Sequence, residues 1–448
     1  MASLVFRFVK AVSFYKYITA CYSSVRIPAK NNLRRNITMF KKVLSLLLIA
    51  TLLCSMALCF ASCNKDDDAT GMSESPLPIP ELTADFTVPE DFKIGFICLH
   101  DESSTYDKNF IDAVLRYQAA LGLKDEQVII KRNIEETEKC YEAAVDLVSQ
   151  GCDIIFANSF GHEPYVAQAA EAYPDVQFCH ATGVTAADKG LDNFHNAFAS
   201  IYQGRYLAGI AAGLKLNEMI EEGKITADQA KIGYVGAYTY AEVISGYTSF
   251  YLGAKSVCPS ATMEVQFTGS WYDVTAEKNA AEALLARNCV LISQHADSMG
   301  APGACEAAGV PNVSYNGSTY EACPETFIVS SAINWAPYYM YITKCFSTGA
   351  DINANWCGGI EEGSVVLTGI NLDVAADGTV DAINDAIAEF KAGTLNVFNT
   401  ANFTVDGKTL TNADNANIKD GYFHESEVIS APSFDLRIDG ITLLNEKF

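Results

Sequence analysis

The sequence predicts an α/β fold in which two doubly wound parallel-sheet lobes are joined by a hinge. From about residue 91 onward, short apolar runs alternate with amphipathic stretches, which is the pattern of successive βαβ units. A weak internal repeat points the same way. Lys93–Phe96 has a near copy at Lys231–Tyr234, and Cys152–Ile155 has one at Cys289–Ile292. The two offsets are 138 and 137 residues, so two similar lobes are favoured.

The expected elements follow from these runs, taken in order. Strands are expected near residues 93–99, 127–131, 153–157, 176–181, 231–236, 263–268, 289–294 and 327–331. Helices are expected near residues 105–121, 135–149, 162–173, 201–219, 240–254, 275–287, 300–308 and 335–348. In the first helix, Phe110, Val114 and Tyr117 fall on one face at spacings of four and three. Strands and helices that alternate in this way form parallel sheets covered on both faces.

The repeat also suggests how the chain is divided. We expect residues 91–196 with about 325–355 to form lobe 1, and residues 197–324 with about 356–448 to form lobe 2. The chain should cross between the lobes near residues 196–200, 315–325 and 350–365. Residues after about 371 are polar and rich in turn patterns, so they are expected to complete lobe 2 with hairpins.

The first 62 residues differ sharply in charge from the rest of the chain. They hold nine basic residues and no acidic one, whereas the remainder carries 22 Lys and Arg against 54 Asp and Glu, a net charge of −32. Residues 43–61 are almost purely apolar, follow Lys41-Lys42 and lead into Cys63. This order is typical of an export signal. The run Phe60-Ala61-Ser62-Cys63 resembles a bacterial lipobox, and a plain membrane anchor is the alternative.

The start of the chain is therefore interpreted in four parts. Residues 1–38 are an extension upstream of the true initiator, residues 39–62 are a lipoprotein signal peptide, and Cys63 is the lipidated residue. Residues 63–90 are rich in Asp, Ser and Pro without periodicity, so a flexible tether is expected there. The protein should lie on the extracytoplasmic face of the bacterial cell membrane, held by the lipid of Cys63.

Ten cysteines follow Cys63, and none of them forms a C-x-x-C pair. Several lie inside apolar, strand-like runs, such as Cys98, Cys179 and Cys289. Disulfides can form outside the cell, but this pattern favours buried free thiols that act as small hydrophobic residues.

Ligands of open α/β sheets bind beyond the carboxyl ends of the strands. Residues at these positions are mostly aromatic or amide-bearing: His100 to Tyr106, Asn158 to Gly161, His180 to Gly183, Tyr238, Ser270 to Asp273, Gln294 to Ser298, Tyr315, Asn316, Asn334 and Trp335. Such a surface stacks on a flat ring and hydrogen-bonds to its edges. The acidity of the body argues against a nucleic-acid polymer as partner.

The sequence shows no catalytic or metal-binding motif. It has no G-x-S-x-G elbow, no G-x-x-x-x-G-K-[ST] phosphate loop and no H-E-x-x-H helix. None of its six histidines has metal-ligand spacing with another His or Cys. We therefore expect no enzyme, no cofactor and no metal. His295 and Asp297, two positions apart after a strand, leave acid–base chemistry as the alternative.

Seven ordered segments closely resemble the basic-membrane-protein (BMP) family of substrate-binding lipoproteins. They are Cys152–Gly161, Tyr173–Val176, His180–Gly183, Tyr202–Gly209, Trp271–Asp273, Gln294–Ser298 and Asn334–Tyr339. The resemblance runs from about Lys93 to Gly369. It implies a type I periplasmic-binding-protein fold, an ABC permease with its ATPase as partners, and a purine nucleoside or nucleobase as ligand.

Three family motifs carry over residue by residue. The family's T-x-T-W-F-D-P stretch falls on Thr268–Val274 and places its tryptophan at Trp271, with Val274 instead of Pro. Its Q-H-T-D-S stretch falls on Gln294–Ser298, with Ala296 in place of Thr. Its D-K-S-F-N stretch falls on Asp107–Ile111, where Ser and Asn are changed. Because this loop leads into the cleft, the change leaves the exact ligand open.

The residues predicted to bind the ligand are Tyr106, Asp107, Asn158, Ser159, Phe160, Trp271, Asp297, Asn316 and Trp335. Several have a structural alternative that stays open. Trp271 would stack on the ligand or pack between the lobes, and Trp335 would line the site or lie in the core. Asp297 would accept a hydrogen bond from a base or cap a helix. Asn158 would cap the following helix, and Asn316 would form a turn. Arg205 is expected to pair with a carboxylate.

The leading hypothesis is a lipid-anchored, monomeric receptor that captures a small planar solute by closing two lobes around it. A purine nucleoside or nucleobase is the expected solute, delivered to an ABC importer. One alternative is a surface enzyme that processes nucleosides with His295 and Asp297. The other is a ligand-sensing surface receptor not coupled to transport, which the genes beside this one would distinguish.

Overall fold

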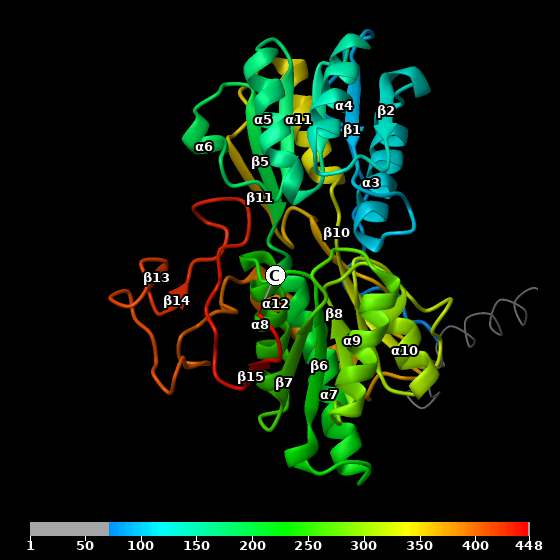
Figure 1. Cartoon of the computed structure of the whole chain (residues 1–448), viewed down its shortest axis with the longest axis vertical. Coiled ribbons are helices and arrows are strands. Elements are labelled where there is room, and N and C mark those ends of the chain that lie inside the picture. Colours follow the sequence, from blue (N-terminus) through cyan, green and yellow to red (C-terminus); the bar gives the residue numbers. More distant parts are fainter. Residues whose placement is uncertain (1–70, 447–448) are drawn as a thin grey trace, which may run out of the picture. The chain divides into compact units, whose positions relative to one another are not determined.

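The structure is a computed structural model that describes residues 71–446 of the chain (Figure 1). The interpretations of residues 1–38 and 39–62, of Cys63, and of the first part of the expected tether lie outside the described residues. Within residues 71–446, no helix has both the length and the apolar character needed to cross a membrane.

A six-stranded, fully parallel sheet forms the core of lobe 1, in the order β11-β5-β4-β3-β1-β2. Its strands are β1 (Ile94–Ile97), β2 (Val128–Lys131), β3 (Ile154–Ala157), β4 (Gln177–Ala181), β5 (Phe194–Ala199) and β11 (Asn355–Gly358). Its helices are α3 (Thr105–Leu121), α4 (Glu138–Ser149), α5 (Glu163–Ala172), α6 (Ala186–Lys189) and α11 (Ala336–Thr348). The short 3-10 helices are η1 (Asp125–Gln127) and η2 (Phe160–His162).

A seven-stranded sheet forms the core of lobe 2, in the order β12-β10-β9-β8-β6-β7-β15. Its strands are β6 (Lys231–Gly236), β7 (Thr262–Phe267), β8 (Leu291–Gln294), β9 (Asn312–Tyr315), β10 (Phe327–Ile333), β12 (Val365–Leu367) and β15 (Ile441–Leu443). Only β12 runs antiparallel to its neighbour among these described strands. The helices are α7 (Ile201–Glu221), η3 (Ala227–Gln229), α8 (Ala241–Val257), α9 (Val274–Ala286), α10 (Gly300–Ala308) and α12 (Thr379–Lys391).

The predicted fold class of two parallel-sheet α/β lobes is confirmed. The strand β5 escaped the sequence pattern because its segment, Phe194–Ala199, contains two polar residues that are nevertheless buried. His195 Nε2 lies 2.8 Å from Gln177 Oε1, and Asn196 Oδ1 accepts a hydrogen bond from the Ala186 N–H at 2.8 Å. Partners from other elements thus satisfy polar groups that would otherwise exclude a buried strand.

The boundary between the lobes differs from the prediction at residues 327–333, which were expected in lobe 1 and lie in lobe 2. These residues form the strand β10, which pairs in parallel with β9 and lies in the second sheet (Figure 1). All seven residues of β10 are buried. The chain reaches lobe 1 only after Ile333, through α11 and then β11, which pairs with β5. A fully buried strand has the same sequence pattern in either sheet, so the sequence could not assign β10.

The expectation of a flexible tether is corrected for residues 71–85. Ser73 N donates to Ile370 O (2.8 Å), and Leu367 N donates to Leu77 O (2.9 Å). Farther along, the Lys344 ammonium lies 2.7 Å from the Asp85 carboxylate. The reason is that β12 is the edge strand of its sheet, and its outward backbone groups need partners. The Pro-rich segment supplies them without any periodic pattern of its own.

The C-terminal residues add a final strand and an aromatic cluster. The short strands β13 (Ile418–Lys419) and β14 (Tyr422–Phe423) form a hairpin, and β15 pairs with β7. The rings of Phe398 and Phe434 stack with centroids 4.2 Å apart. Ser430 N also donates to Asn355 Oδ1 in β11 (3.3 Å). The segment therefore contacts strands of both sheets.

The helices α7 and α8 of lobe 2 pack unusually closely. A Cβ added at Gly209 of α7 would lie 2.1 Å from Phe250 O, and one added at Gly253 of α8 would lie 2.0 Å from Tyr206 O. Glycine at both positions lets the two backbones touch. This contact sets the position of α8, whose first turn faces the pocket described below.

The ten cysteines among residues 71–446 are all free thiols, and nine of them are buried. Burial raises the pKa of Cys140 and Cys305 to about 12, and that of Cys152 to about 11. These thiols therefore stay protonated at neutral pH and fill the core as small hydrophobic groups. This agrees with the interpretation drawn from their apolar surroundings in the sequence.

Candidate functional site

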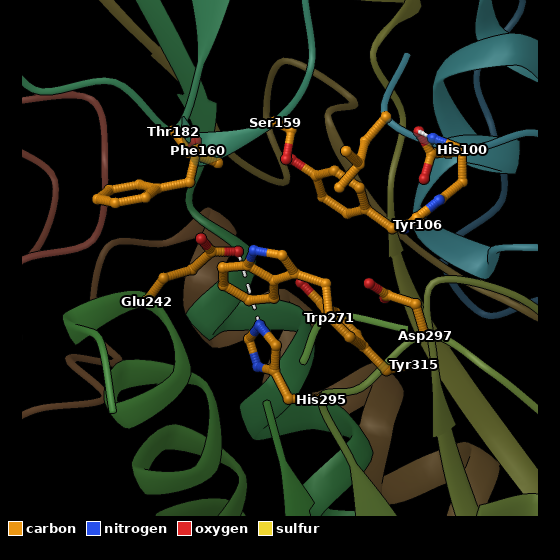
Figure 2. Close-up of a pocket in the computed structure, with 12 residues that line it drawn as sticks. His100, Tyr106, Ser159, Phe160, Thr182, Glu242, Trp271, His295, Asp297 and Tyr315 are labelled. Atoms are coloured by element: carbon orange, nitrogen blue, oxygen red, sulfur yellow. Dashed lines mark hydrogen bonds and ion pairs between the residues drawn. The ribbon is translucent and has the colours of Figure 1, made fainter. Parts of the chain in front are cut away.

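A pocket of about 370 Å³, partly open to solvent, lies between the carboxyl ends of the two sheets (Figure 2). Residues of lobe 1 that line it are Leu99, His100, Tyr106, Asp107, Ser159, Phe160 and Thr182. Residues of lobe 2 that line it are Glu242, Trp271, His295, Asp297 and Tyr315. Seven of the twelve lie within three residues after the end of a strand, as the rule for open α/β sheets predicts.

The structure brings six of the nine predicted site residues together in this pocket. They are Tyr106, Asp107, Ser159, Phe160, Trp271 and Asp297. Among the remaining lining residues, His100, Thr182, His295 and Tyr315 belong to the strand-end positions singled out in the sequence. Leu99 and Glu242 were missed. An acidic residue in the first turn of the helix after β6 was the available signal for Glu242, because that turn faces the cleft.

Two predicted residues lie just behind the pocket wall. Asn158 is fully buried, donates to Asp107 Oδ1 (2.7 Å) and accepts from Leu99 N (3.0 Å). Asn316 has a positive φ of 64° and donates from its Nδ2 to Asp297 Oδ1 (3.3 Å). Each therefore orients a carboxyl group that does line the pocket. Neither residue is among those that line the pocket.

Trp335 is placed in the core, so its predicted role in the wall is corrected. Its side chain is 1% exposed, and its ring stacks on Phe110 with centroids 4.4 Å apart and an interplanar angle of 21°. Phe156 contacts it from another side at 5.6 Å. Trp335 directly precedes α11. Because α11 packs against α3, the Trp335 ring lies in the core beside Phe110 of α3.

The lobe 1 wall is organised around Asp107. Ser104 caps α3, since its hydroxyl oxygen accepts from the Asp107 N–H (3.2 Å). Asp107 Oδ1 accepts from His100 N (3.0 Å) and from Asn158 Nδ2 (2.7 Å). Within residues 71–446, Asp107 Oδ2 receives no hydrogen bond, so it is available to a ligand. The neighbouring Tyr106 hydroxyl donates to Asn158 O (2.8 Å).

Aromatic rings from both lobes meet at the more open side of the pocket. Trp271 lies edge-on to Tyr238 with centroids 5.0 Å apart, and Tyr238 stacks on Tyr240 at 5.1 Å. Phe160 of lobe 1 stacks on Tyr240 at 5.0 Å, and both rings are 38% exposed. These rings form one surface across the boundary between the lobes.

Hydrogen bonds hold the lobes together on the opposite side. Asp297 O accepts from both the N–H (3.0 Å) and the hydroxyl (3.1 Å) of Thr105. Asn109 Nδ2 donates to Asn316 Oδ1 (3.1 Å). Each of these contacts joins α3 or its cap to a strand end of the second sheet. The structure is therefore a closed conformation of the two-lobe fold.

The pocket is rich in acidic groups, and no lysine or arginine among residues 71–446 lines it. Three carboxyl groups line it, those of Asp107, Glu242 and Asp297. Burial raises the pKa of Asp297 well above its ordinary value, and Glu277 and Asp107 add to the rise. Burial lowers the pKa of His295, so its imidazole is neutral at pH 7. The wall therefore suits a neutral or cationic molecule that donates hydrogen bonds, and it disfavours anions.

Arg205 lies beneath this wall, fully buried. It was expected to pair with a carboxylate, but among the described residues it forms no ion pair. Its guanidinium lies 4.5 Å from the centre of the Tyr315 ring, and its Nη2 donates to Tyr234 Oη (2.5 Å). Aromatic faces and neutral oxygens thus take the place of the expected acid.

The described part of the chain also lacks any cluster of three His, Cys, Asp or Glu side chains arranged to hold a metal ion. His295 and Asp297 both line the pocket but have different partners. His295 lies near Glu242, and Asp297 binds Asn316. The two residues are therefore not paired with each other.

The family of ABC transporter substrate-binding proteins described as PnrA-like (Bmp) matches residues 97–397. This chain belongs to that family. It is 30% identical over 312 residues to a purine-binding protein of Brucella abortus, a match that covers 69% of this chain and 83% of the relative. It is 32% identical over 228 residues to a putative ABC transporter glucose-binding protein of Haloferax volcanii, covering 50% of this chain and 54% of that relative.

A solved structure shows the same fold. An ABC transporter solute-binding protein from Conexibacter woesei aligns with a TM-score of 0.55 at 20% identity, covering 68% of this chain and 98% of the other. The fold is that of type I periplasmic binding proteins. As a member of the Bmp family, the protein binds a small molecule on the extracytoplasmic side and partners with an ABC permease. The resemblance drawn from the seven sequence segments is thereby confirmed.

Two of the three tryptophans, Trp271 and Trp335, should separate stability from binding. Trp335→Ala should lower the free energy of unfolding by about 3–5 kcal/mol, because it empties a fully packed site. Trp271→Ala removes a partly exposed ring from the pocket wall and should cost less than half as much. Urea unfolding without ligand, followed by circular dichroism, measures both. Equal losses would contradict the placement of one ring in the core and the other in the wall.

Proposed function

We propose that this Bmp-family protein captures an unphosphorylated purine nucleoside or nucleobase and delivers it to an ABC importer. One observation carries the proposal: an aromatic wall beside carboxyl oxygens that have no hydrogen-bond partner in the described chain. A flat ring would pack against Trp271, gaining contact area and stacking energy. Its N–H and amino groups would bind the free oxygens. The name of the Brucella abortus relative, a purine-binding protein, supports the same solute.

The placement of the carboxyl groups supports contacts from both lobes. Asp297 would accept a hydrogen bond from an N–H or exocyclic amine of the base, and Asp107 Oδ2 would accept from a second donor across the cleft. Charge-assisted hydrogen bonds of this kind contribute about 1.5–3 kcal/mol each. Since the two residues belong to different lobes, a solute bound by both would favour the closed state.

The charge of the wall argues for a solute without phosphate. A phosphate group would face three carboxyl groups, and no lysine or arginine of the pocket wall would neutralise it. Burying an unpaired charge in such a space is strongly unfavourable. Nucleosides and bases avoid this cost, whereas nucleotides do not.

Isothermal titration calorimetry of the purified protein tests the solute. Adenine, guanine, adenosine, guanosine and inosine form the purine panel, with AMP and glucose as controls. At least one unphosphorylated purine should bind, and AMP should bind at least tenfold more weakly than adenosine. Chromatography should recover the bound solute unaltered, since capture changes no covalent bond. Glucose binding without any purine binding would refute the purine assignment, and a converted nucleoside would support the enzymatic alternative.

Binding should also release a proton if Asp297 accepts a hydrogen bond from the solute. Burial, with Glu277, Asp107 and Glu242 nearby, raises the pKa of Asp297 in the free protein. An N–H donor stabilises the ionised carboxylate and lowers that pKa, so the complex holds fewer protons than the free protein. Affinity should therefore increase as the pH rises towards the free-state pKa. Titrations in phosphate and in Tris, whose ionisation enthalpies differ, should give different binding enthalpies.

The variant Asp297→Asn provides the control for this proton. It cannot ionise, so its binding enthalpy should be the same in both buffers. Proton release that persists in Asp297→Asn would assign the titrating group elsewhere.

We also propose that lipid on Cys63 anchors the protein to the membrane. The apolar run and the small residues before Cys63 support this assignment. Gly71 is hydrogen-bonded to Asp373 beside the β12 edge (3.0 Å). Seven residues lie between it and Cys63, and the eight steps from one Cα to the next span at most about 29 Å when fully extended. The anchor would thus keep the Gly71 side of lobe 2 within this distance of the lipid-bearing residue.

Replacing Cys63 by Ala should release the protein from membranes, because the thiol that receives the lipid is lost. Detergent phase partitioning and incorporation of labelled palmitate measure the change. Cys59→Ala, within the apolar run of the signal, is the matched control and should remain lipid-modified. A Cys63→Ala protein that still enters the detergent phase would favour the plain membrane anchor.

A further inference from the structure

The pocket contains one carboxylate that the proposed purine contacts leave unused. Glu242 lies in the first turn of α8 and enters the pocket from lobe 2. Figure 2 shows Glu242 and Asp297 on opposite sides of the Trp271 ring. Any flat solute resting on this ring would therefore present one edge to Asp297 and another to Glu242.

Glu242 is nearly buried yet receives no hydrogen bond from the described residues. Its side chain is only 11% exposed. His295 Nε2 lies 3.6 Å from Glu242 Oε1, a close contact that is longer than a hydrogen bond. Its carboxylate lines the pocket, where no described residue donates a hydrogen bond to it. The missing donor fits a bound molecule.

The environment of His295 holds this arrangement in place. Its Nδ1 faces Tyr234 Oη at 3.5 Å, and Tyr234 Oη accepts from Arg205 Nη2 at 2.5 Å. A guanidinium can only donate, so the Tyr234 hydrogen is free to point at His295 Nδ1. His295 then carries its own hydrogen on Nε2, facing Glu242.

The helix α8 leaves room for His295 to lie beside Glu242. Glu242 and Gly246 are four residues apart and lie on the same face of the helix. A Cβ added at Gly246 would lie 2.9 Å from His295 Nδ1. Glycine at this position leaves room for the imidazole directly beside the helix that carries Glu242.

We propose that Glu242, backed by the neutral His295, determines specificity by accepting a hydrogen bond from an N–H or O–H group on the edge of the solute opposite Asp297. The inference rests on the proposed capture of a solute in this pocket and not on that solute being a purine. It defines the solute class more narrowly, as a small molecule with hydrogen-bond donors on two opposite edges. A solute without the second donor leaves Glu242 buried and unpaired, so it is rejected.

The variant Glu242→Gln tests the proposal, because it keeps the shape of the side chain and removes its charge. Calorimetric titration with the purines and glucose should show affinity for the best-bound solute reduced about ten- to hundredfold, the range expected for a charge-assisted hydrogen bond. Glu282→Gln is the matched control, since Glu282 lies on α9 with its side chain 54% exposed. It should bind within twofold of wild type. Thermal unfolding of both variants verifies that they fold.

Matched solutes identify the group that Glu242 recognises. Adenine and guanosine each carry an amino group that purine and inosine, respectively, lack. Wild type should prefer the amino-bearing member of at least one pair, and Glu242→Gln should reduce that preference severalfold. Equal affinities of wild type and Glu242→Gln for the best solute would overturn the proposal while leaving a purine assignment intact. Binding of glucose alone would refute the purine assignment, yet loss of glucose affinity in Glu242→Gln would still support the role of Glu242.

A measurement without any solute provides an independent check. Nitrogen-15 NMR of the imidazole rings, with His295→Gln used to assign the signal, reports which nitrogen of His295 carries the hydrogen. A hydrogen on Nε2 is expected. A hydrogen on Nδ1 alone would place a lone pair opposite Glu242 and would overturn the proposal whichever solute binds.

Discussion

The closed cleft depends on how Asp297 is held where the two sheets meet. Its N–H donates to Trp271 O (3.0 Å), and its backbone oxygen accepts from the N–H and hydroxyl of Thr105 in the other lobe. Its carboxyl group lines the pocket and receives a hydrogen bond from Asn316 (3.3 Å). One residue therefore links the aromatic wall, the contact between lobes and the polar edge of the pocket. Any displacement of the end of β8 would disturb all three together.

The composition of the pocket follows from this junction, because closure brings acidic groups of both lobes into one partly enclosed space. Asp107 comes from lobe 1, and Asp297 and Glu242 come from lobe 2. Burial raises the pKa of Asp297, and nearby Glu277, Asp107 and Glu242 add to the rise, so the closed state carries an electrostatic cost. A solute that supplies hydrogen-bond donors removes part of that cost. In the proposed function, solute capture and lobe closure are coupled through the same oxygens.

Local patterns predicted much of the fold, and the failures share one cause. The alternation of apolar runs and amphipathic helices was sufficient for the fold class, because each element buries its own apolar face. The strand β5 was missed because the partners of His195 and Asn196 come from distant segments. The strand β10 was assigned to the wrong lobe, and residues 71–85 were taken for a tether. In each case a neighbouring element supplied the pairing that decided the outcome.

The residues of the site show the same contrast between what the sequence predicted and what the tertiary structure decided. Strand-end position pointed to Tyr106 and Trp271, because the carboxyl ends of parallel strands share one edge of a sheet, whereas Asp107 came from the family motif. The sequence by itself thus determined the two-lobe fold, the family and the edge where the pocket lies. Only the tertiary structure decided that Trp335 packs in the core, that Asn158 and Asn316 act from behind the wall, and that Glu242 enters it. Burial and hydrogen-bond partnership arise between segments far apart in the chain, and no local pattern of residues contains them.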